Sequence, residues 1–95
     1  MSGAGAPKLK IDATGLAVTV IVTSWHTQIT DGLLAGAERA LQAAGNDIYT
    51  VVRVPGAFEL PLAAQWAAED GADAIIALGV VIQGDTPHFD YVCKA

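Results

Sequence analysis

The stretch LAVTVIVT, residues 16–23, decides the fold. It is apolar and β-branched over its whole length, which is typical of a strand buried in a parallel sheet rather than of a half-exposed strand. Two later stretches have a similar character, IYTVVRV at residues 48–54 and AIIALGVVI at residues 74–82. The sequence therefore predicts three strands, of which the first and third are buried.

Helical segments follow each of these strands. After the first, apolar residues recur at helical spacing: Ile29, Leu33, Ala37, Leu41 and Ala44. Gly45 is placed to end that helix. Residues 60–70 predict a second helix, in which Pro61 lies in the first turn and Trp66 is expected to pack, and residues 88–95 begin a third. This alternation predicts an α/β fold, a parallel sheet with helices on both faces and right-handed crossovers.

The length of 95 residues fits one domain. Residues 1–10 are rich in Gly, Ala and Pro and predict a flexible arm, which leaves residues 11–95 as the domain. The last helix has no stop signal, so we expect the domain to be truncated and the sheet to be incomplete at the C-terminus. Apolar residues make up 53% of the chain. So large a fraction predicts surface that further chain or other subunits cover.

The charge and the single cysteine exclude several classes of protein. A formal net charge of -5 without a Lys/Arg cluster is unfavourable for binding nucleic acid or an anionic membrane. No apolar run is long enough to span a bilayer, and the N-terminus lacks the apolar core of a secretory signal. Cys93 excludes an internal disulfide, suits a reducing cytoplasm, and is expected to be buried.

Loops with unusual residues follow all three strands. They read SWH at residues 24–26, PGAFE at 55–59 and QGDTPH at 83–88. The carboxyl ends of parallel strands meet at one edge of a sheet, and ligands of open α/β sheets bind outside that edge. We therefore expect one binding site built from these three loops.

The first two loops offer stacking and hydrogen-bonding groups, each with a structural alternative. Trp25 and Phe58 can stack on a planar heterocycle, or can pack in the core or at an interface. His26 is either a donor in a pocket or a solvated loop residue. Glu59 either accepts from ligand hydroxyls or only complements the dipole of the second helix.

The third loop offers an anion site and a proton carrier. Free amides at a helix start and the hydroxyl of Thr86 suit an anion, with Gly84 beside them, although the carboxylate of Asp85 opposes one. His88 can accept or donate a proton as a neutral imidazole, or can be hydrogen-bonded for structure. Two histidines without ligand-spaced Cys, His or Asp predict no metal site.

Taken together, the three loops resemble those of the lumazine synthase family. The resemblance rests on GAFELP at residues 56–61, on ALGVVIQGDTPHFDYV at residues 77–92, and on the SWH turn. It implies a flavodoxin-like subunit and homo-oligomers, either pentamers or icosahedral shells of pentamers. It also implies condensation of 5-amino-6-(D-ribitylamino)uracil with 3,4-dihydroxy-2-butanone 4-phosphate to 6,7-dimethyl-8-ribityllumazine, the penultimate step of riboflavin biosynthesis, without cofactor or metal.

The resemblance also implies a role for each site residue. Trp25 would stack on the pyrimidine ring and His26 would line the edge of that ring. Three segments would complete the site. The ribityl chain would contact Ala57, Phe58 and Glu59. The heterocycle would contact Val80, Val81 and Ile82, and the phosphate would be bound by Gly84, Asp85 and Thr86. His88 would be the catalytic acid and base. The family more often has Phe and Asn where this chain has Trp25 and His26.

Two other functions fit the same fold. One is a flavodoxin-like flavin-binding protein without enzymatic activity, which would be yellow as isolated. This alternative usually has a Ser/Thr-rich phosphate loop after the first strand, where this chain has SWH. The other is a shell-forming member of the family that has lost catalysis.

Overall fold

A computed structural model describes residues 10–83 and 87–94 of the chain. Three strands, β1 (Val18–Thr23), β2 (Thr50–Val54) and β3 (Ala74–Leu78), form one parallel sheet in the order β2-β1-β3. The predicted parallel α/β architecture is confirmed. The arm predicted at residues 1–10 lies, except for Lys10, outside the described residues.

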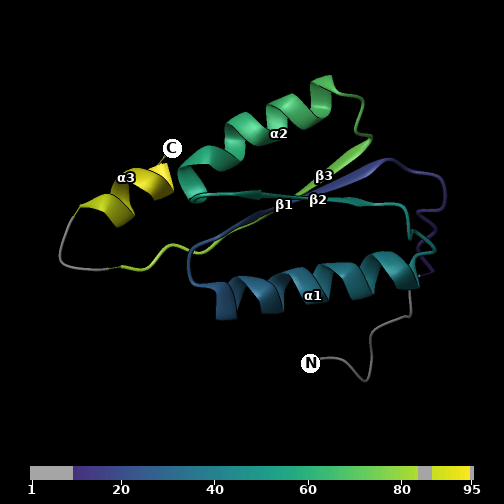
Figure 1. Cartoon of the computed structure of the whole chain (residues 1–95), viewed down its shortest axis with the longest axis horizontal. Helices are drawn as coiled ribbons and strands as arrows, with labels where there is room; N and C mark the ends of the chain where they lie inside the picture. The colour runs from purple at the N-terminus through teal and green to yellow at the C-terminus, as the bar shows by residue number, and fades with distance from the viewer. Residues whose placement is uncertain (1–9, 84–86, 95) are drawn as a thin grey trace.

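Helices cover both faces of this sheet (Figure 1). The helix α1 (Thr27–Ala43) lies against one face, and α2 (Leu60–Glu69), preceded by the 3-10 turn η2 (Ala57–Glu59), lies against the other. The short α3 (His88–Lys94) lies beyond the end of the sheet at which the strands finish. No helix in the described part of the chain combines the length and apolar character needed to cross a membrane.

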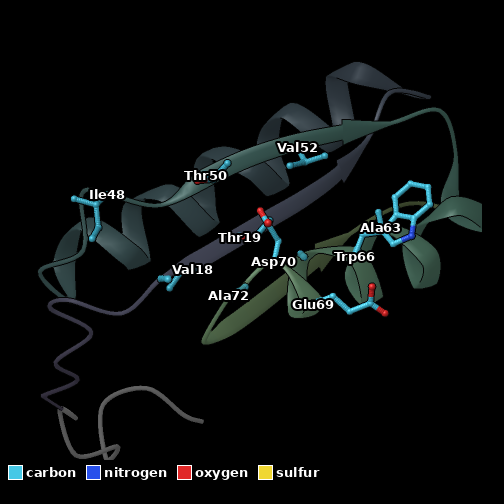
Figure 2. A pocket seen from close by; sticks show the side chains of 13 residues that line it. Val18, Thr19, Ile48, Thr50, Val52, Ala63, Trp66, Glu69, Asp70 and Ala72 are labelled. Carbon is cyan, nitrogen blue, oxygen red and sulfur yellow. The ribbon is translucent and has the colours of Figure 1, made fainter.

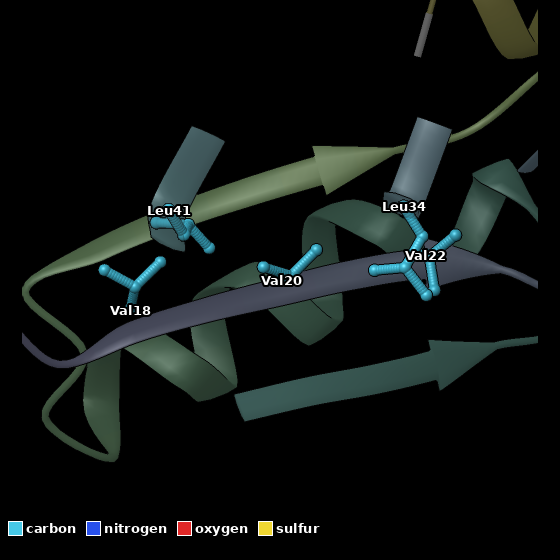
Figure 3. Close-up of a cluster of buried hydrophobic side chains, with 5 residues drawn as sticks. All are labelled: Val18, Val20, Val22, Leu34 and Leu41. Atoms are coloured by element: carbon cyan, nitrogen blue, oxygen red, sulfur yellow. The ribbon is translucent and has the colours of Figure 1, made fainter. Parts of the chain in front are cut away.

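The core is built on β1, because this strand has a neighbour on each side and a helix on each face. Alternate β1 side chains pack against two leucines of α1 in a buried cluster: Val18, Val20, Val22, Leu34 and Leu41 (Figure 3). Burying one such side chain stabilises the fold by about 1.5–3 kcal/mol. Ile21, on the opposite face of the strand, is fully buried as well. β1 is thus buried on both faces, whereas Leu16 and Ala17, which precede it in the apolar run, are exposed.

The order of the strands opens a crevice at one end of the sheet. The chain passes from β1 through α1 to β2 on one side, and then from β2 through α2 to β3 on the other side of β1. With right-handed crossovers, this reversal places the two helices on opposite faces. The loops that leave β1 and β3 therefore diverge. The place where the strand order reverses is called the switch point, and ligands of open α/β sheets bind there.

The strands are shorter than the apolar patterns that predicted them. The third was expected to reach residue 82, but β3 ends at Leu78, where its pairing with Val22 of β1 ends. Residues 79–83 have no regular secondary structure. β1 and β2 likewise begin two residues later than predicted. A strand ends where its neighbour stops pairing, and an apolar run does not mark that point. The apolar pattern therefore extends past the paired residues.

Three predictions of burial were wrong. The third strand was expected to be buried, but β3 lies at an edge of the sheet and none of its residues is buried. Trp66 was expected to pack but is 61% exposed, because α2 lies over β1 and β3 and leaves the same face of β2 uncovered. Cys93 was expected to be buried but is exposed, since it lies on α3, which packs little against the rest of the described chain.

The end of α1 is fixed by Asn46, which is almost fully buried. Its amide nitrogen donates to the carbonyl oxygens of Ala13 at 3.0 Å and Leu16 at 2.8 Å, and its side-chain oxygen accepts from the Ile48 amide at 3.2 Å. Gly45, just before it, has a φ of +84° and no room for a side chain against Thr14. One side chain therefore joins the segment before β1 to the end of α1 and the start of the next segment.

We expect Asn46→Ala to lower the free energy of unfolding by about 2–4 kcal/mol, because it leaves two carbonyls and one amide, each buried or partly buried, without their partner. Chemical denaturation of the complete natural protein measures this loss. The neighbouring exposed residue supplies the control, Asp47→Ala, which should change stability by less than about 0.5 kcal/mol. Equal losses in the two variants would contradict the role of Asn46.

Candidate functional site

A cavity of about 400 Å³ lies at the switch point of the sheet, a volume within the ordinary range of small-molecule sites. Four parts of the chain line it: the loop after β1, the η2 turn, the segment after β3, and α3. The lining residues are Trp25, His26, Gly56, Ala57, Phe58, Glu59, Val80, Val81, Ile82, His88 and Val92. Every predicted site residue that the structure describes is in this set, while Gly84, Asp85 and Thr86 lie outside the described residues.

Trp25 is presented to the cavity by a strained turn. Its side chain is 68% exposed, so the alternative that it fills the core is wrong. His26 has a left-handed backbone with a φ of 54°, the single non-glycine case in the described part of the chain. That conformation costs an L-residue roughly 1–2 kcal/mol. The carbonyl of His26 accepts from the amides of Ile29 and Thr30, so the strained residue turns the chain directly from β1 into α1.

Trp25 and Glu59 meet over Gly56. A methyl group added at Gly56 would lie 3.6 Å from Cδ1 of Trp25 and 3.5 Å from Oε2 of Glu59. Because Gly56 has no side chain, the indole of Trp25 and the carboxylate of Glu59 can both lie close to it. Among the described residues, the side chain of Glu59 makes no capping hydrogen bond at the start of α2, so the carboxylate can accept from a ligand.

The opposite wall comes from the segment after β3. Val80 and Val81 are half-buried, whereas Ile82 is 52% exposed at the mouth of the cavity. Phe58, at 56% exposure, gives a second open aromatic side chain, so the core alternative is wrong for this residue too. The cavity therefore combines apolar walls with a small number of polar groups, which is the usual composition of a site for a small organic ligand.

His88 is the first residue of α3 and is exposed toward the cavity that it lines. Val92 lies four residues later, one helical turn away, and lines the same cavity. Val92 and Gly56 also line the cavity but are not among the site residues predicted from the sequence. The i, i+4 spacing from His88 would have identified Val92, because such residues share one face of a helix.

A larger hollow of about 710 Å³ lies elsewhere, between α2 and the uncovered face of β2 (Figure 2). Its walls are mainly apolar or small side chains, among them Ile48, Val52, Ala63 and Trp66. The carboxylates of Glu69 and Asp70 are its titratable groups. It has no set of converging polar groups and does not lie at the carboxyl ends of the strands. We therefore assign the functional site to the smaller cavity.

The chemistry of the smaller cavity is that of a site for a planar, hydroxylated ligand. It holds an indole for stacking, a carboxylate for hydroxyl groups, and two imidazoles that can carry protons. No group of three or more His, Cys, Asp or Glu side chains suited to a metal ion occurs within residues 10–83 and 87–94.

Comparison with known proteins agrees with this geometry. A model of the 6,7-dimethyl-8-ribityllumazine synthase family matches residues 15–95. A protein of that name from Kineococcus radiotolerans is 60% identical over 95 residues, which are 100% of this chain and 59% of the relative. One from Leifsonia xyli subsp. xyli is 57% identical over 97 residues, 100% of this chain and 61% of the relative.

A third relative of the same name, from Streptomyces coelicolor, is 57% identical over 95 residues, 99% of this chain and 59% of its own length. The chain thus spans about three fifths of the length of the curated relatives that it matches. The family match includes every residue that lines the cavity. With its parallel flavodoxin-like sheet and this extent of identity, the chain belongs to the 6,7-dimethyl-8-ribityllumazine synthase family.

Proposed function

We propose that this protein condenses 5-amino-6-(D-ribitylamino)uracil with 3,4-dihydroxy-2-butanone 4-phosphate to 6,7-dimethyl-8-ribityllumazine. The observation that carries the proposal is that one cavity gathers all the described residues expected to bind and convert these substrates. The names of the relatives, which are 57–60% identical, support the same reaction. No cofactor or metal enters the proposal.

The pyrimidine is held between the loop after β1 and the segment after β3. Its ring stacks on Trp25, with His26 at its edge and residues 80–82 along the opposite wall. The close approach of Trp25 and Glu59 over Gly56 supports this pose, because a ribityl chain that leaves a ring on Trp25 starts beside the Glu59 carboxylate. Ribityl hydroxyls then donate to that carboxylate, while Ala57 and Phe58 flank the chain.

The phosphate of the second substrate is assigned to Gly84, Asp85 and Thr86. Backbone amides and the Thr86 hydroxyl suit a phosphate, whatever the side chain of Asp85 does. This assignment rests on the sequence and on the family alone.

His88 is the proton carrier of the proposed reaction. The 5-amino group attacks the ketone carbonyl, and a first water leaves as the imine forms. Phosphate then leaves by elimination, which generates a second carbonyl group. The ribitylamino nitrogen adds to this carbonyl carbon, and a second water leaves as the ring closes. Each departure needs a proton at the leaving oxygen, and each addition or elimination needs one removed from nitrogen or carbon. The position of His88 at the mouth of the cavity supports this role, because the imidazole can exchange protons with the ligand and with solvent.

Assembly into a homo-oligomer, as a pentamer or as a shell of pentamers, is part of the proposal. The exposed apolar side chains of Ile48, Val52 and Trp66 around the larger hollow support it, because such surface favours burial against another chain. A cytoplasmic location completes the proposal, in keeping with the single cysteine of the chain.

The direct test supplies both substrates to the complete natural protein and follows the lumazine by absorbance and fluorescence. We expect turnover without added metal or cofactor. A colourless protein that forms lumazine supports the proposal. A protein that is yellow as isolated and forms none is a flavin-binding member instead. Ordered shells without turnover would identify a structural member that has lost catalysis.

Trp25→Ala should weaken binding of the pyrimidine more than binding of the butanone phosphate. Loss of the stacked pair removes about 0.5–1.5 kcal/mol beyond the lost burial. Trp25→Phe keeps an aromatic face and should be mild, which makes it the matched control. Calorimetric titration with each substrate separately measures both affinities. Equal weakening for the two substrates would assign Trp25 a structural role instead.

His88→Ala should slow turnover roughly 10–100-fold without abolishing it. A positioned acid and base contributes about 10²–10⁴-fold, and the lower end applies because the amine and the ketone already react once they are held together. The loss should appear in kcat, with little change in KM. The assay follows lumazine formation at saturating substrate across a pH series. An unchanged kcat and pH profile would return His88 to a structural role.

His26→Ala should show the opposite pattern, with a higher KM for the pyrimidine and a nearly unchanged kcat, because His26 contacts the bound ring equally before and during the reaction. His26→Asn is the control, since Asn tolerates the left-handed backbone and keeps a polar edge. Steady-state kinetics of both variants separates the two parameters. A fall in kcat for His26→Ala at constant KM would assign it to the chemistry.

A further inference from the structure

Residues near the start of both cavity walls come close together at Gly79, which is itself exposed. A Cβ atom added to Gly79 would lie 3.0 Å from Cδ1 of Leu60, 3.3 Å from Cγ2 of Thr23 and 3.7 Å from Cβ of Ala57. The first two separations are tighter than an ordinary Cβ contact. Gly79 is therefore inserted among side chains from the end of β1, the η2 turn and the start of α2.

The register of the sheet explains this position. Val22 pairs with Leu78, so Gly79 continues the row that Thr23 and its partner Val54 form on the α2 face. β3 ends one residue earlier, and residues 80–82 leave from Gly79 to form the wall of the cavity. The facing wall, residues 57–59, leads directly into Leu60. Gly79 thus lies where both walls originate.

Space rather than backbone conformation requires glycine here. Gly79 is not among the glycines with a positive φ, which are Gly15, Gly45 and Gly71 in the described chain. Any residue can adopt its backbone, but a Cβ would force the Leu60 or Thr23 side chain to move by a few tenths of an ångström. Thr23 is 1% exposed and cannot easily retreat. The displacement would therefore fall on Leu60 and on the two walls.

We propose that Gly79 is a positioning residue that sets the width of the cavity through its contact with Leu60 and Thr23. The absence of a side chain lets residues 80–82 approach the 57–59 turn closely enough for one flat ring and its chain to touch both walls. The inference rests on the proposed function for the identity of that ligand. Gly79 does not line the cavity and acts through its neighbours.

The test compares four variants of the complete natural protein: Gly79→Ala, Leu60→Val, the double variant of these two, and Gly32→Ala. Leu60→Val removes both δ carbons, so in the double variant the added methyl has the space that Cδ1 occupied. Gly32→Ala adds the same methyl on α1, where nothing lies within 4 Å, and serves as the matched control.

We expect Gly79→Ala to raise the KM for the ribityl pyrimidine roughly 3–10-fold, with a smaller change in kcat, because misplacement of a binding wall costs affinity before it costs chemistry. The double variant should recover most of this loss, and Gly32→Ala should change neither parameter. An unchanged KM in Gly79→Ala, or a rise that Leu60→Val does not relieve, would overturn the inference. Thermal unfolding of every variant separates a general loss of stability from a change confined to the cavity.

A crystal structure of Gly79→Ala gives a second, ligand-free measurement. The separation between the Cα atoms of Ala57 and Val81 should increase relative to the unsubstituted protein. An unchanged separation would overturn the inference even if the protein makes lumazine. Conversely, absence of lumazine formation by the unsubstituted protein would overturn the proposed function, and the separation would still decide whether Gly79 sets the width of the cavity.

Discussion

The burial of β1 on both faces is the constraint on which the rest of the structure depends. A strand whose side chains are apolar on both faces needs a helix against each of them, and α1 and α2 meet that need only if the chain reverses its winding direction after β2. The reversal separates the loops that leave β1 and β3. The cavity is therefore a consequence of how the core is buried, and its residues occupy a space that the topology opens.

The two ends of the sheet serve opposite purposes. At the end where β1 begins, Asn46, which is almost fully buried, satisfies three backbone groups at once. At the end where β1 finishes, His26 is strained, Trp25 is exposed, and the buried hydroxyl of Thr23 has no partner among the described residues. Each of these features costs stability. Stabilising contacts at one end thus support a binding end that is less stable on its own, as is common for functional sites.

Glycines shape the cavity as much as its side chains do. Gly56 lets the indole of Trp25 and the carboxylate of Glu59 approach a single point, and Gly79 lets the opposite wall start against Leu60. Both glycines act because they lack a side chain and so leave space. Neither has a positive φ, the backbone conformation that most often requires glycine at a position. A ligand that is thin and must touch both walls benefits from backbone at these points, because a side chain would keep the walls apart.

The sequence by itself determined the three strands, the two main helices and the edge of the sheet at which the candidate site is predicted. A buried strand requires an apolar run, and a helix that packs on a sheet requires apolar residues at regular spacing. Both patterns are local properties of LAVTVIVT and of the segments after it. Three loops at one edge follow from parallel strands alone. The sequence could not determine where β3 ends, that Trp66 and Cys93 are exposed, or that Val92 joins the site. Those outcomes depend on which neighbour pairs with a strand or covers a helix. Only the tertiary structure decides this, because such contacts join residues far apart in the chain.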